Sequence, residues 1–505
     1  MVATPTETEI KLVFEPSLRG EIERHPAFAG AAQTTPRRHE LTTYFDTDDL
    51  LLHRHGYSLR IRKSNRHFVQ TLKQVPEKSA AVHQRNEWEW NLNDNRLLLR
   101  PVQQMIAASG LDGEFHHPRP RVVTDIQRQS FKILREGCEI EAVIDEGTVK
   151  AGGREESIHE IELELKNGRS GPAFRLAMEL LERHAFGLGW ESKADRGYRL
   201  LTGCGTPPRK VRAAPIPQDA ALGEALALGT TTALHGFVAN LPAAHAGIPE
   251  GVHQARVALR RVRSVLVFYA HYLEPCARER YNNAIREIGA ILGAARDWDV
   301  FIDEALPAAA SAGVPADWVV ALNDAADIQR KAAHAAVREK LESKAPAELI
   351  LGLESWISEP AWATDSTKIS RTPVRKLMPK LLDRLACKVE HRGRHLARRS
   401  ANELHPLRKS LKKLRYSAEN ASELYRKKSV KRYVKSCKKL QTILGTINDA
   451  QVTTRLLTKI APLDSAALGA AAGAMQKWNG ERRAAVRSDL KTAWRKLNGT
   501  DPFWK

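Results

Sequence analysis

The sequence predicts an α+β protein in which a strand-rich N-terminal domain precedes a domain built only of helices. Three observations support this. Short runs of alternating apolar and polar residues recur through 1–205, and long Ala-, Leu-, Arg- and Lys-rich stretches of helical pattern fill 219–505. The helical part also contains an internal repeat. A chain of 505 residues is too long for one ordinary core, so at least two domains are expected.

The strand-rich domain is expected to span residues 1–205. Its predicted strands lie at 7–14, 40–46, 57–63, 66–75, 84–92, 128–135, 138–144, 147–150 and 158–166, with helices at 16–25, 101–109 and 172–187. Residues 206–218, rich in Pro and charge, are predicted to form an interdomain linker.

The repeat divides the helical domain, residues 219–505, into halves at about 219–343 and 373–503. The segment that begins at His253 matches the segment that begins at His405, and the L-G-x-x-x-D element ending at Asp297 matches the one ending at Asp449. Both pairs are 152 residues apart. A constant offset over two separate motifs predicts two pseudo-symmetric helical bundles.

Charge is distributed very unevenly along the chain. The total is +20, yet residues 1–200 hold 29 Lys and Arg against 30 Asp and Glu, and residues 371–440 hold 23 basic against 5 acidic residues. Such a field indicates a polyanionic partner: nucleic acid, an anionic membrane surface or polyphosphate. The plain alternative is a solvated basic helical surface.

A signal peptide, a transmembrane helix, a disulfide framework and a zinc site are not expected. The N-terminus lacks a basic and apolar leader, and no apolar run is long enough to span a membrane. Five cysteines are scattered without C-x-x-C spacing, which suits a reducing compartment. We therefore expect a cytoplasmic protein without membrane insertion.

Charged residues gather on one face of most predicted strands, because strand side chains alternate with a period of two. These sets are Glu7, Glu9 and Lys11; Arg60 and Arg62; Lys73; Arg85, Glu87 and Glu89; Arg128, Ser130 and Lys132; Glu139 and Glu141; and Glu160, Glu162 and Glu164. For a single strand, a polar solvent face would explain the pattern. Its recurrence favours a closed barrel with a charged interior and apolar faces packed outward against helices.

Buried charges must be paired or bound to a ligand. Arg and Lys bind phosphate oxygens, whereas carboxylates bind Mg²⁺ or Mn²⁺, hard cations that prefer oxygen. The interior is therefore predicted to hold a divalent metal and an oxyanion.

Residues 1–203 resemble a CYTH domain, of the triphosphate tunnel metalloenzyme family. The resemblance rests on E-x-E-x-K at Glu7–Lys11, S-L-R-I-R at 58–62, T-L-K at 71–73, Q-R-x-E-x-E at 84–89, E-I-E-A-V-I-D-E-G at 139–147, E-I-E-L-E-L at 160–165 and S-K-A-D-R-G-Y at 192–198. It implies an eight-stranded antiparallel tunnel that binds triphosphates with Mg²⁺ or Mn²⁺. It further implies phosphate binding by Lys11, Arg60, Arg62, Lys73, Arg85, Arg128, Lys132 and Lys193, metal binding by Glu7, Glu9, Glu162 and Glu164, and catalytic roles for Glu9, Lys11, Glu162 and Glu164.

Each helical repeat carries a basic stripe at helical spacing. The stripes are His253, Arg256, Arg260 and Arg263 in one repeat and His405, Arg408, Lys412 and Arg415 in the other. Like charges at these spacings destabilise an isolated helix, which indicates a bound anion. Residues 371–440 contain no Trp or Phe for base stacking, so we do not expect nucleic acid. Asp297 and Asp449 are interpreted as helix caps or arginine partners, with metal ligation as the alternative.

Residues 219–503 resemble a CHAD domain, which implies two pseudo-repeated four-helix bundles associated with inorganic polyphosphate. The predicted function is therefore metal-dependent hydrolysis of inorganic triphosphate, coupled to polyphosphate binding and to an association with polyphosphate granules. Two alternatives stay open: a non-enzymatic polyphosphate-binding protein, and a triphosphatase acting on nucleoside or thiamine triphosphate.

Overall fold

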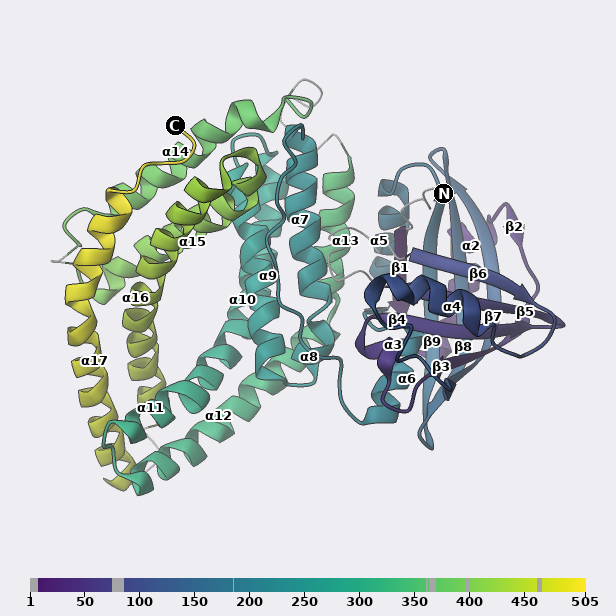
Figure 1. Ribbon diagram of the computed structural model, residues 1–505, viewed down its shortest axis with the longest axis horizontal. Coiled ribbons are helices and arrows are strands. Elements are labelled where there is room, and N and C mark those ends of the chain that lie inside the picture. The colour runs from purple at the N-terminus through teal and green to yellow at the C-terminus, as the bar shows by residue number, and fades with distance from the viewer. Residues whose placement is uncertain are drawn as a thin grey trace. The chain divides into compact units, whose positions relative to one another are not determined.

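The computed structural model describes residues 8–74, 86–184, 186–359, 362, 369–396, 399–460 and 466–505. The chain forms two compact units (Figure 1). The first contains the chain up to Pro207 together with Glu342–Glu359. The second contains Pro208–Leu341 and Pro360–Lys505. The predicted α+β class is confirmed, since the strands lie in the first unit and the second is helical.

The first unit, called the tunnel unit below, is built on one antiparallel sheet. Its strands are β1 (Thr8–Val13), β2 (Gln33–Thr34), β3 (Arg38–Asp46), β4 (Tyr57–Ser64), β5 (His67–Gln74), β6 (Asn86–Leu92), β7 (Arg119–Arg135), β8 (Cys138–Ala151), β9 (Arg154–Asn167) and β10 (Gly187–Leu188). They pair in the order β10-β1-β9-β8-β7-β3-β4-β5-β6, and β2 pairs with β7. Eight strands exceed two residues, as the eight-stranded expectation requires. The expected closure is not found: in the described residues no ladder joins β6 to β1 or β10.

Short helices connect and cover the strands of the tunnel unit. They are the 3-10 turns η1 (Pro16–Leu18) and η2 (Ala107–Ser109) and the α-helices α1 (Arg19–Arg24), α2 (Pro26–Ala29), α3 (Leu51–Arg54), α4 (Leu99–Ile106), α5 (Gly171–Arg183) and α6 (Lys193–Thr202). Apolar side chains of β1 and β9 pack against α5, and those of β4 and β5 pack against α4. The outward apolar faces that the sequence predicts are thus present, and they leave the charged residues on the opposite face of the sheet.

One helix of the tunnel unit comes from far along the sequence. Helix α13 (Lys344–Ser358) follows the first helical repeat, yet Ala347 and Leu351 lie in the same buried cluster as residues of α5 (Figure 1). Lys344 donates a hydrogen bond from Nζ to the carbonyl oxygen of Leu181 at 2.7 Å. The side chain of Glu359 lies 3.3 Å from that of Arg175. The chain therefore leaves the helical unit, completes the tunnel unit and returns.

The second unit, called the helical unit, contains the predicted repeat. Its helices are α7 (Leu222–Val238), α8 (Leu241–His245), α9 (Pro249–Phe268), α10 (Pro275–Val300), the π-helical η3 (Phe301–Ala305), α11 (Leu306–Ser311), α12 (Ala316–Glu342), α14 (Val374–Gly393), α15 (Ala401–Asn420), η6 (Ala421–Leu424), α16 (Lys427–Ile460) and α17 (Ala466–Asn498). Helices α14, α15 and α16 each begin 152 residues after α7, α9 and α10. With α12 and α17, each half has four long helices. None of the helices in the described chain combines the length and the apolar character that crossing a membrane requires.

The expected linker, residues 206–218, is anchored on the helical unit. The backbone amide of Val211 donates to Gln254 of α9 at 2.9 Å, and that of Ile216 donates to the carbonyl of Asn420 at 2.8 Å. Ile216 is buried. Residues 209–216 therefore pack along the helices, and the backbone amides of Arg209, Val211 and Ile216 find acceptors there.

Candidate functional site

The strand register brings the charged residues of the tunnel unit onto one shared face. Lys11 of β1 lies opposite Glu162 of β9, and Glu160 of β9 lies opposite Asp145 of β8. Asp145 in turn lies opposite Arg128 of β7. Residues that are directly paired point to the same side of a sheet, so these charges meet.

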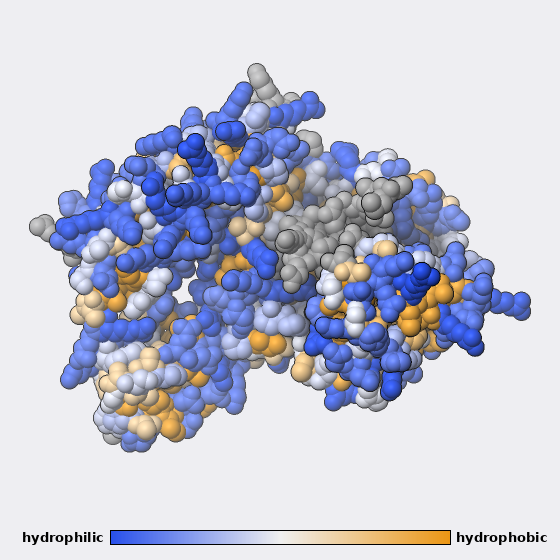
Figure 2. Space-filling view, in the orientation of Figure 1, coloured by the Kyte–Doolittle hydropathy of each residue, from blue (hydrophilic) through white to orange (hydrophobic). Residues whose placement is uncertain are grey.

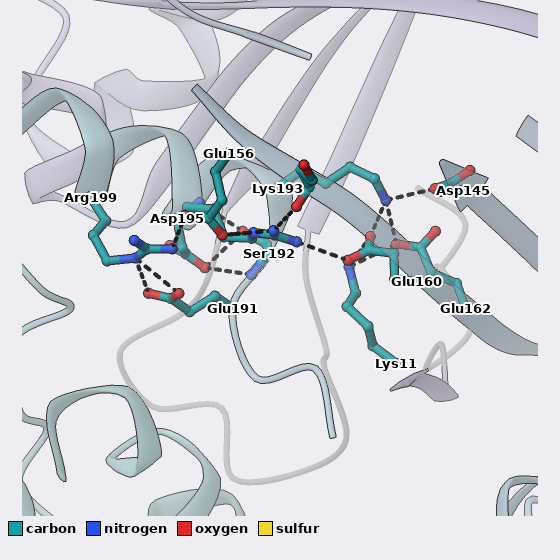
Figure 3. A network of polar contacts seen from close by, with 12 residues as sticks. Lys11, Asp145, Glu156, Glu160, Glu162, Glu191, Ser192, Lys193, Asp195 and Arg199 are labelled. Atoms are coloured by element: carbon teal, nitrogen blue, oxygen red, sulfur yellow. Dashed lines mark hydrogen bonds and ion pairs between the residues drawn. The ribbon is translucent and has the colours of Figure 1, made fainter. Parts of the chain in front are cut away.

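Three carboxylates form the centre of this face. One oxygen from each of Asp145, Glu160 and Glu162 lies within 4.8 Å of the other two. Two lysines converge on them (Figure 3). The Nζ of Lys11 lies 3.1 Å from Glu160 and 2.8 Å from Glu162. The Nζ of Lys193 lies 2.7 Å from Asp145 and 2.9 Å from Glu162, and it also contacts Glu160.

Arg128 completes the set of cations. Its Nε donates to Asp145 Oδ1 at 2.7 Å and its Nη2 to Asp145 Oδ2 at 2.5 Å, a bidentate pair. The same Nη2 lies 3.1 Å from Glu162 Oε2. Asp145 and Glu160 are fully buried, and the side chain of Arg128 is only 16% exposed. The charges are therefore shielded from water, which strengthens their mutual attraction.

The electrostatics of the site follow from this burial and pairing. Burial lowers the pKa of Lys11, but the carboxylates of Glu160 and Glu162 raise it by more, so the net shift is upward. The pKa of Lys193 is raised in the same way. Burial raises the pKa of Glu162, yet Lys11, Lys193 and Arg128 together hold it well below the usual range. These shifts favour the charged forms of Lys11, Lys193 and Glu162 at neutral pH.

A divalent metal fits the carboxylate cluster. Hard cations such as Mg²⁺ and Mn²⁺ prefer carboxylate oxygens. The Oε2 atom of Glu160 is buried and has no hydrogen-bond partner, and Nη1 of Arg196 lies 3.8 Å from it. A buried carboxylate oxygen without a hydrogen bond is costly unless a ligand contacts it. Asp145, Glu160 and Glu162 could therefore hold the metal.

Helix α6 carries Lys193 into the site. Ser192 and Asp195 form a capping box that begins the helix directly before Lys193. Three residues on, the Tyr198 hydroxyl donates to the buried carboxylate of Asp46 at 3.2 Å. Between them lies Gly197, where a Cβ atom would come within 2.0 Å of a methyl group of Val122 in β7. In the motif S-K-A-D-R-G-Y, the serine thus caps the helix, the lysine reaches the carboxylates, the glycine allows the close approach to β7 and the tyrosine bonds to Asp46.

We expect Gly197→Val to reduce phosphate release from a triphosphate by about tenfold or more, because α6 must move away from the sheet and take Lys193 with it. The measurement is kcat/KM of the purified variant. Gly20→Val serves as the control, since nothing lies within 4 Å of a Cβ at that position. Equal activity of the Gly197 variant and the wild type would show that the position of α6 does not matter.

On β4, β5 and β6 the same face carries three cations against the carboxylates of Glu87 and Glu89. Arg60 and Arg62 of β4 and Lys73 of β5 lie on the inward face. Lys73 pairs with Glu87 at 2.8 Å, and Arg60 lies 3.9 Å from the same carboxylate. Burial, followed by the like charge of Arg60, lowers the pKa of Arg62. This part of the face has more positive than negative charge and suits an anion.

The structure does not gather every residue named from the sequence. Glu9 lies at the rim of the cluster, 3.9 Å from the Nζ of Lys11. Glu164 pairs instead with Lys166 at 2.6 Å. Lys132, 41% exposed, pairs with Glu139 at the end of the sheet. Glu7 and Arg85 lie outside the described residues.

Two carboxylates of the cluster, Asp145 and Glu160, are not among the metal ligands expected from the sequence. Asp145 follows Glu139 and Glu141 at two-residue spacing, so period two alone places it on their face. Glu160 was placed on the inward face together with Glu162 but received no role. The sequence contains the signal for both residues, because Asp145 lies in the motif at 139–147 and Glu160 in the motif at 160–165.

A second candidate site lies in the helical unit, where α9 packs against α15. The close approach of Arg256, Arg260, Arg408 and Lys412 forms what we call the basic cluster. Few carboxylates compensate it: Arg256 lies 3.7 Å from Asp297, which also pairs with Arg455 at 2.8 Å.

The two repeats build this cluster in the same way. A Cβ on Gly293 would lie 3.5 Å from Arg256, and one on Gly445 would lie 3.6 Å from Arg408. These glycines are 152 residues apart, as the arginines are. In each repeat the arginine therefore lies beside the equivalent glycine of the neighbouring helix, α10 or α16. Three of the other stripe residues have polar partners of their own. Arg263 hydrogen-bonds to Asn282, and Arg415 hydrogen-bonds to Gln441. His405 hydrogen-bonds to Asn448.

Crowding of like charge marks the basic cluster. Burial, and then the positive charges of Arg260, Arg408 and Arg256, lowers the pKa of Lys412 to about 5. The pKa values of Arg256 and Arg408 are also lowered, first by burial. Figure 2 shows that the visible face of the helical unit is mostly hydrophilic. Asp297 and Asp449 offset only part of this positive charge, so the site suits a polyanion.

Comparisons with known proteins agree with this division. A family model described as the CYTH domain matches residues 5–198, and one described as the CHAD domain matches residues 230–458. The inorganic triphosphatase of Haemophilus influenzae is 28% identical over 205 residues, which cover 38% of this chain. The chain matches about half, 54%, of that relative's length. The crystal structure of the CHAD domain from the plant Ricinus communis is 28% identical, with a TM-score of 0.52, and covers 59% of this chain and 98% of that one.

Proposed function

Because the chain consists of a CYTH domain followed by a CHAD domain, we propose that it is a metal-dependent hydrolase of inorganic triphosphate whose helical unit binds inorganic polyphosphate. The observation that carries the proposal is the buried cluster of Asp145, Glu160 and Glu162, faced by lysines and arginines on the same inward surface. Carboxylates alone would repel a triphosphate, and cations alone would not bind a metal.

The inward cations would bind the phosphate oxygens. We assign this role to Lys11, Arg60, Arg62, Arg128 and Lys193, with Lys73 and Lys132 further along the face. Bidentate arginines would orient the chain of phosphates, and their charge would stabilise the charge that develops on the leaving phosphate. A Mg²⁺ or Mn²⁺ ion, when bound, polarises a phosphoryl oxygen and lowers the pKa of a bound water.

Glu9 and Glu164 are proposed as the carboxylates that orient the attacking water and accept its proton. They lie opposite each other in the β1–β9 register. Both are partly exposed, at 26%, so water can reach them. We favour Glu9 as the group that accepts the proton, because the carboxylate of Glu164 already forms an ion pair with Lys166.

The test is phosphate release from tripolyphosphate with Mg²⁺ or Mn²⁺. We expect activity that disappears when the metal is removed by a chelator, and a loss of about 100-fold or more in Lys11→Ala. Lys150→Ala is the matched control, because Lys150 is 53% exposed and pairs with Glu155 at the far end of β8. An inactive wild type, or a fully active Lys11→Ala protein, would refute the catalytic proposal.

Substrate choice is tested by comparing kcat/KM for tripolyphosphate, a nucleoside triphosphate and thiamine triphosphate. We favour inorganic triphosphate, because the site described above contacts phosphates through charged groups and the fused helical unit favours an inorganic polyanion. A higher kcat/KM for thiamine or nucleoside triphosphate would move the assignment to that substrate. A cytoplasmic location at polyphosphate granules is part of the same proposal, tested by imaging the tagged protein.

The basic cluster supports polyphosphate binding by the helical unit. A charge reversal of Arg256 or Arg408 is expected to weaken polyphosphate binding by about tenfold or more, measured at fixed salt. Duplex DNA at matched charge and salt is the comparison. Equal affinity for DNA would refute specificity for polyphosphate.

Polyphosphate binding is expected to weaken as the pH rises. In the free protein the pKa of Lys412 is about 5, far below that of the unfolded chain, so Lys412 is neutral at pH 7. A bound polyanion restores the proton, so binding takes up about one proton and the affinity falls up to about tenfold per pH unit between about pH 7.5 and 9.5. By the same linkage, the unfolded chain holds the extra proton, so the stability of the helical unit rises with pH over this range. In Lys412→Met, the pH dependence of polyphosphate affinity and that of stability should both be reduced. If neither changes, Lys412 is not the group responsible.

A further inference from the structure

Without ligands, the carboxylate cluster of the tunnel unit is neutralised by the chain itself. Within 3.1 Å, Asp145, Glu160 and Glu162 contact the side chains of three cations: Lys11, Lys193 and Arg128. Lys193 alone contacts all three carboxylates. The lysine amines therefore occupy the positions around the oxygens that a metal ion would need.

We propose that Lys11 and Lys193 neutralise the carboxylate cluster when no ligand is bound, and that their ammonium groups move to the phosphate oxygens when ligands bind. As a consequence, the divalent metal and the triphosphate each promote the other's binding. This inference rests on the proposed function and adds to it a regulation of the same site. The carboxylates release their ammonium partners when a divalent cation binds. The freed ammonium groups then pair with phosphate oxygens.

Charge balance is the physical reason for this coupling. The ligand-free cluster is close to neutral, with three carboxylates against three cations. A divalent cation alone would leave surplus positive charge in a buried place, and a triphosphate alone would leave surplus negative charge. With both bound the imbalance is smaller than with the triphosphate alone, because the metal offsets two of its negative charges and Arg60 and Arg62 lie on the same face. Since binding free energies are linked, each ligand must then raise the affinity for the other by the same factor.

The geometry allows the exchange without a change in fold. Lysine carries its charge at the end of a flexible four-carbon stem. The stem of Lys11 passes close to Gly189, where a Cβ atom would come within 2.5 Å of Cγ. The stem base is thus held, while the terminal amine can turn between carboxylate and phosphate. Lys193 is likewise fixed at its backbone by the capping box of α6.

The first experiment measures Mn²⁺ binding to the full-length protein in phosphate-free buffer, from the electron paramagnetic resonance signal of free Mn²⁺. Lys193→Met and Lys11→Met should each bind Mn²⁺ about tenfold more tightly than the wild type, because the carboxylates lose a competing cation. Lys73→Met is the matched control. It removes a tunnel lysine that pairs with Glu87 outside the cluster, and its Mn²⁺ affinity should change by less than about twofold.

A role of the lysines in phosphate binding alone would leave Mn²⁺ affinity unchanged in this buffer. Unchanged or weaker Mn²⁺ binding in both variants would overturn the proposal. So would an equal gain in Lys73→Met, since that would indicate a general field effect and no local exchange.

A second measurement uses the wild type only and does not depend on any variant folding. Lysine acetylation is followed residue by residue by mass spectrometry, with and without saturating Mn²⁺. Labelling of Lys11 and Lys193 should rise about fivefold with Mn²⁺, while that of Lys73 stays constant. Unchanged labelling of both residues would overturn the proposal. Neither measurement involves hydrolysis, so an inactive enzyme with a positive exchange result would refute the proposed function and leave this inference standing.

Discussion

Glu162→Gln is expected to lower phosphate release from tripolyphosphate by about 100-fold or more, with the fold intact. The side chain of Glu162 contacts Lys11, Lys193 and Arg128, so one substitution removes a proposed metal ligand and disturbs all three cations. The amide keeps the shape of the carboxylate but carries no charge. The measurement is kcat/KM at saturating metal, with circular dichroism to verify folding.

Glu155→Gln is the control for this prediction. Glu155 lies on the same strand, β9, but its side chain is 50% exposed and pairs with Lys150. Its activity should stay within about twofold of the wild type, because an exposed pair contributes little. If both variants lose activity equally, the effect comes from β9 in general and not from the cluster.

The second large effect concerns stability. Leu351→Ala in α13 is expected to lower the free energy of unfolding of the tunnel unit by about 2–5 kcal/mol, since Leu351 is 2% exposed and packs in the core shared with α5. Hydrogen exchange resolves the units: peptides of β9 and α5 should exchange faster, whereas peptides of α9 and α15 should not.

Two variants serve as controls for the stability prediction. Glu348→Ala changes an exposed residue of α13 and should have little effect. Leu457→Ala opens a cavity in the core of the helical unit and should speed exchange there instead. Faster exchange in the helical unit of Leu351→Ala would contradict the assignment of α13 to the tunnel unit.

Much of the site could be predicted because strand periodicity is a local property. Two-residue spacing placed Lys11 and Glu162 on charged faces, and the register then set them opposite each other. The offset of 152 residues likewise predicted the repeat, and three helix starts reproduce it. These features depend on the pattern within short segments, which sequence shows directly.

Other features depend on contacts between distant segments. Helix α6 was not predicted, although the Ser192–Asp195 capping box was visible as a start signal. Its apolar side is short: Ala194, Tyr198 and Leu201 lie in one apolar cluster with residues of β7, β8 and β9, while four of its ten residues are charged and obscure the pattern. The position of α13 on α5 is set by tertiary packing alone, and no local pattern distinguishes it from the helices that precede it.

The path of the chain through α13 restricts how such a protein can be divided or recombined. A fragment that ends at Pro207 lacks residues 342–359 and leaves the surface of α5 uncovered, while a fragment that begins at Pro208 carries a helix without its partner. One protease cut between the units would leave two pieces that still share a core. An exchange of the complete tunnel unit, residues 342–359 included, therefore requires more than one breakpoint.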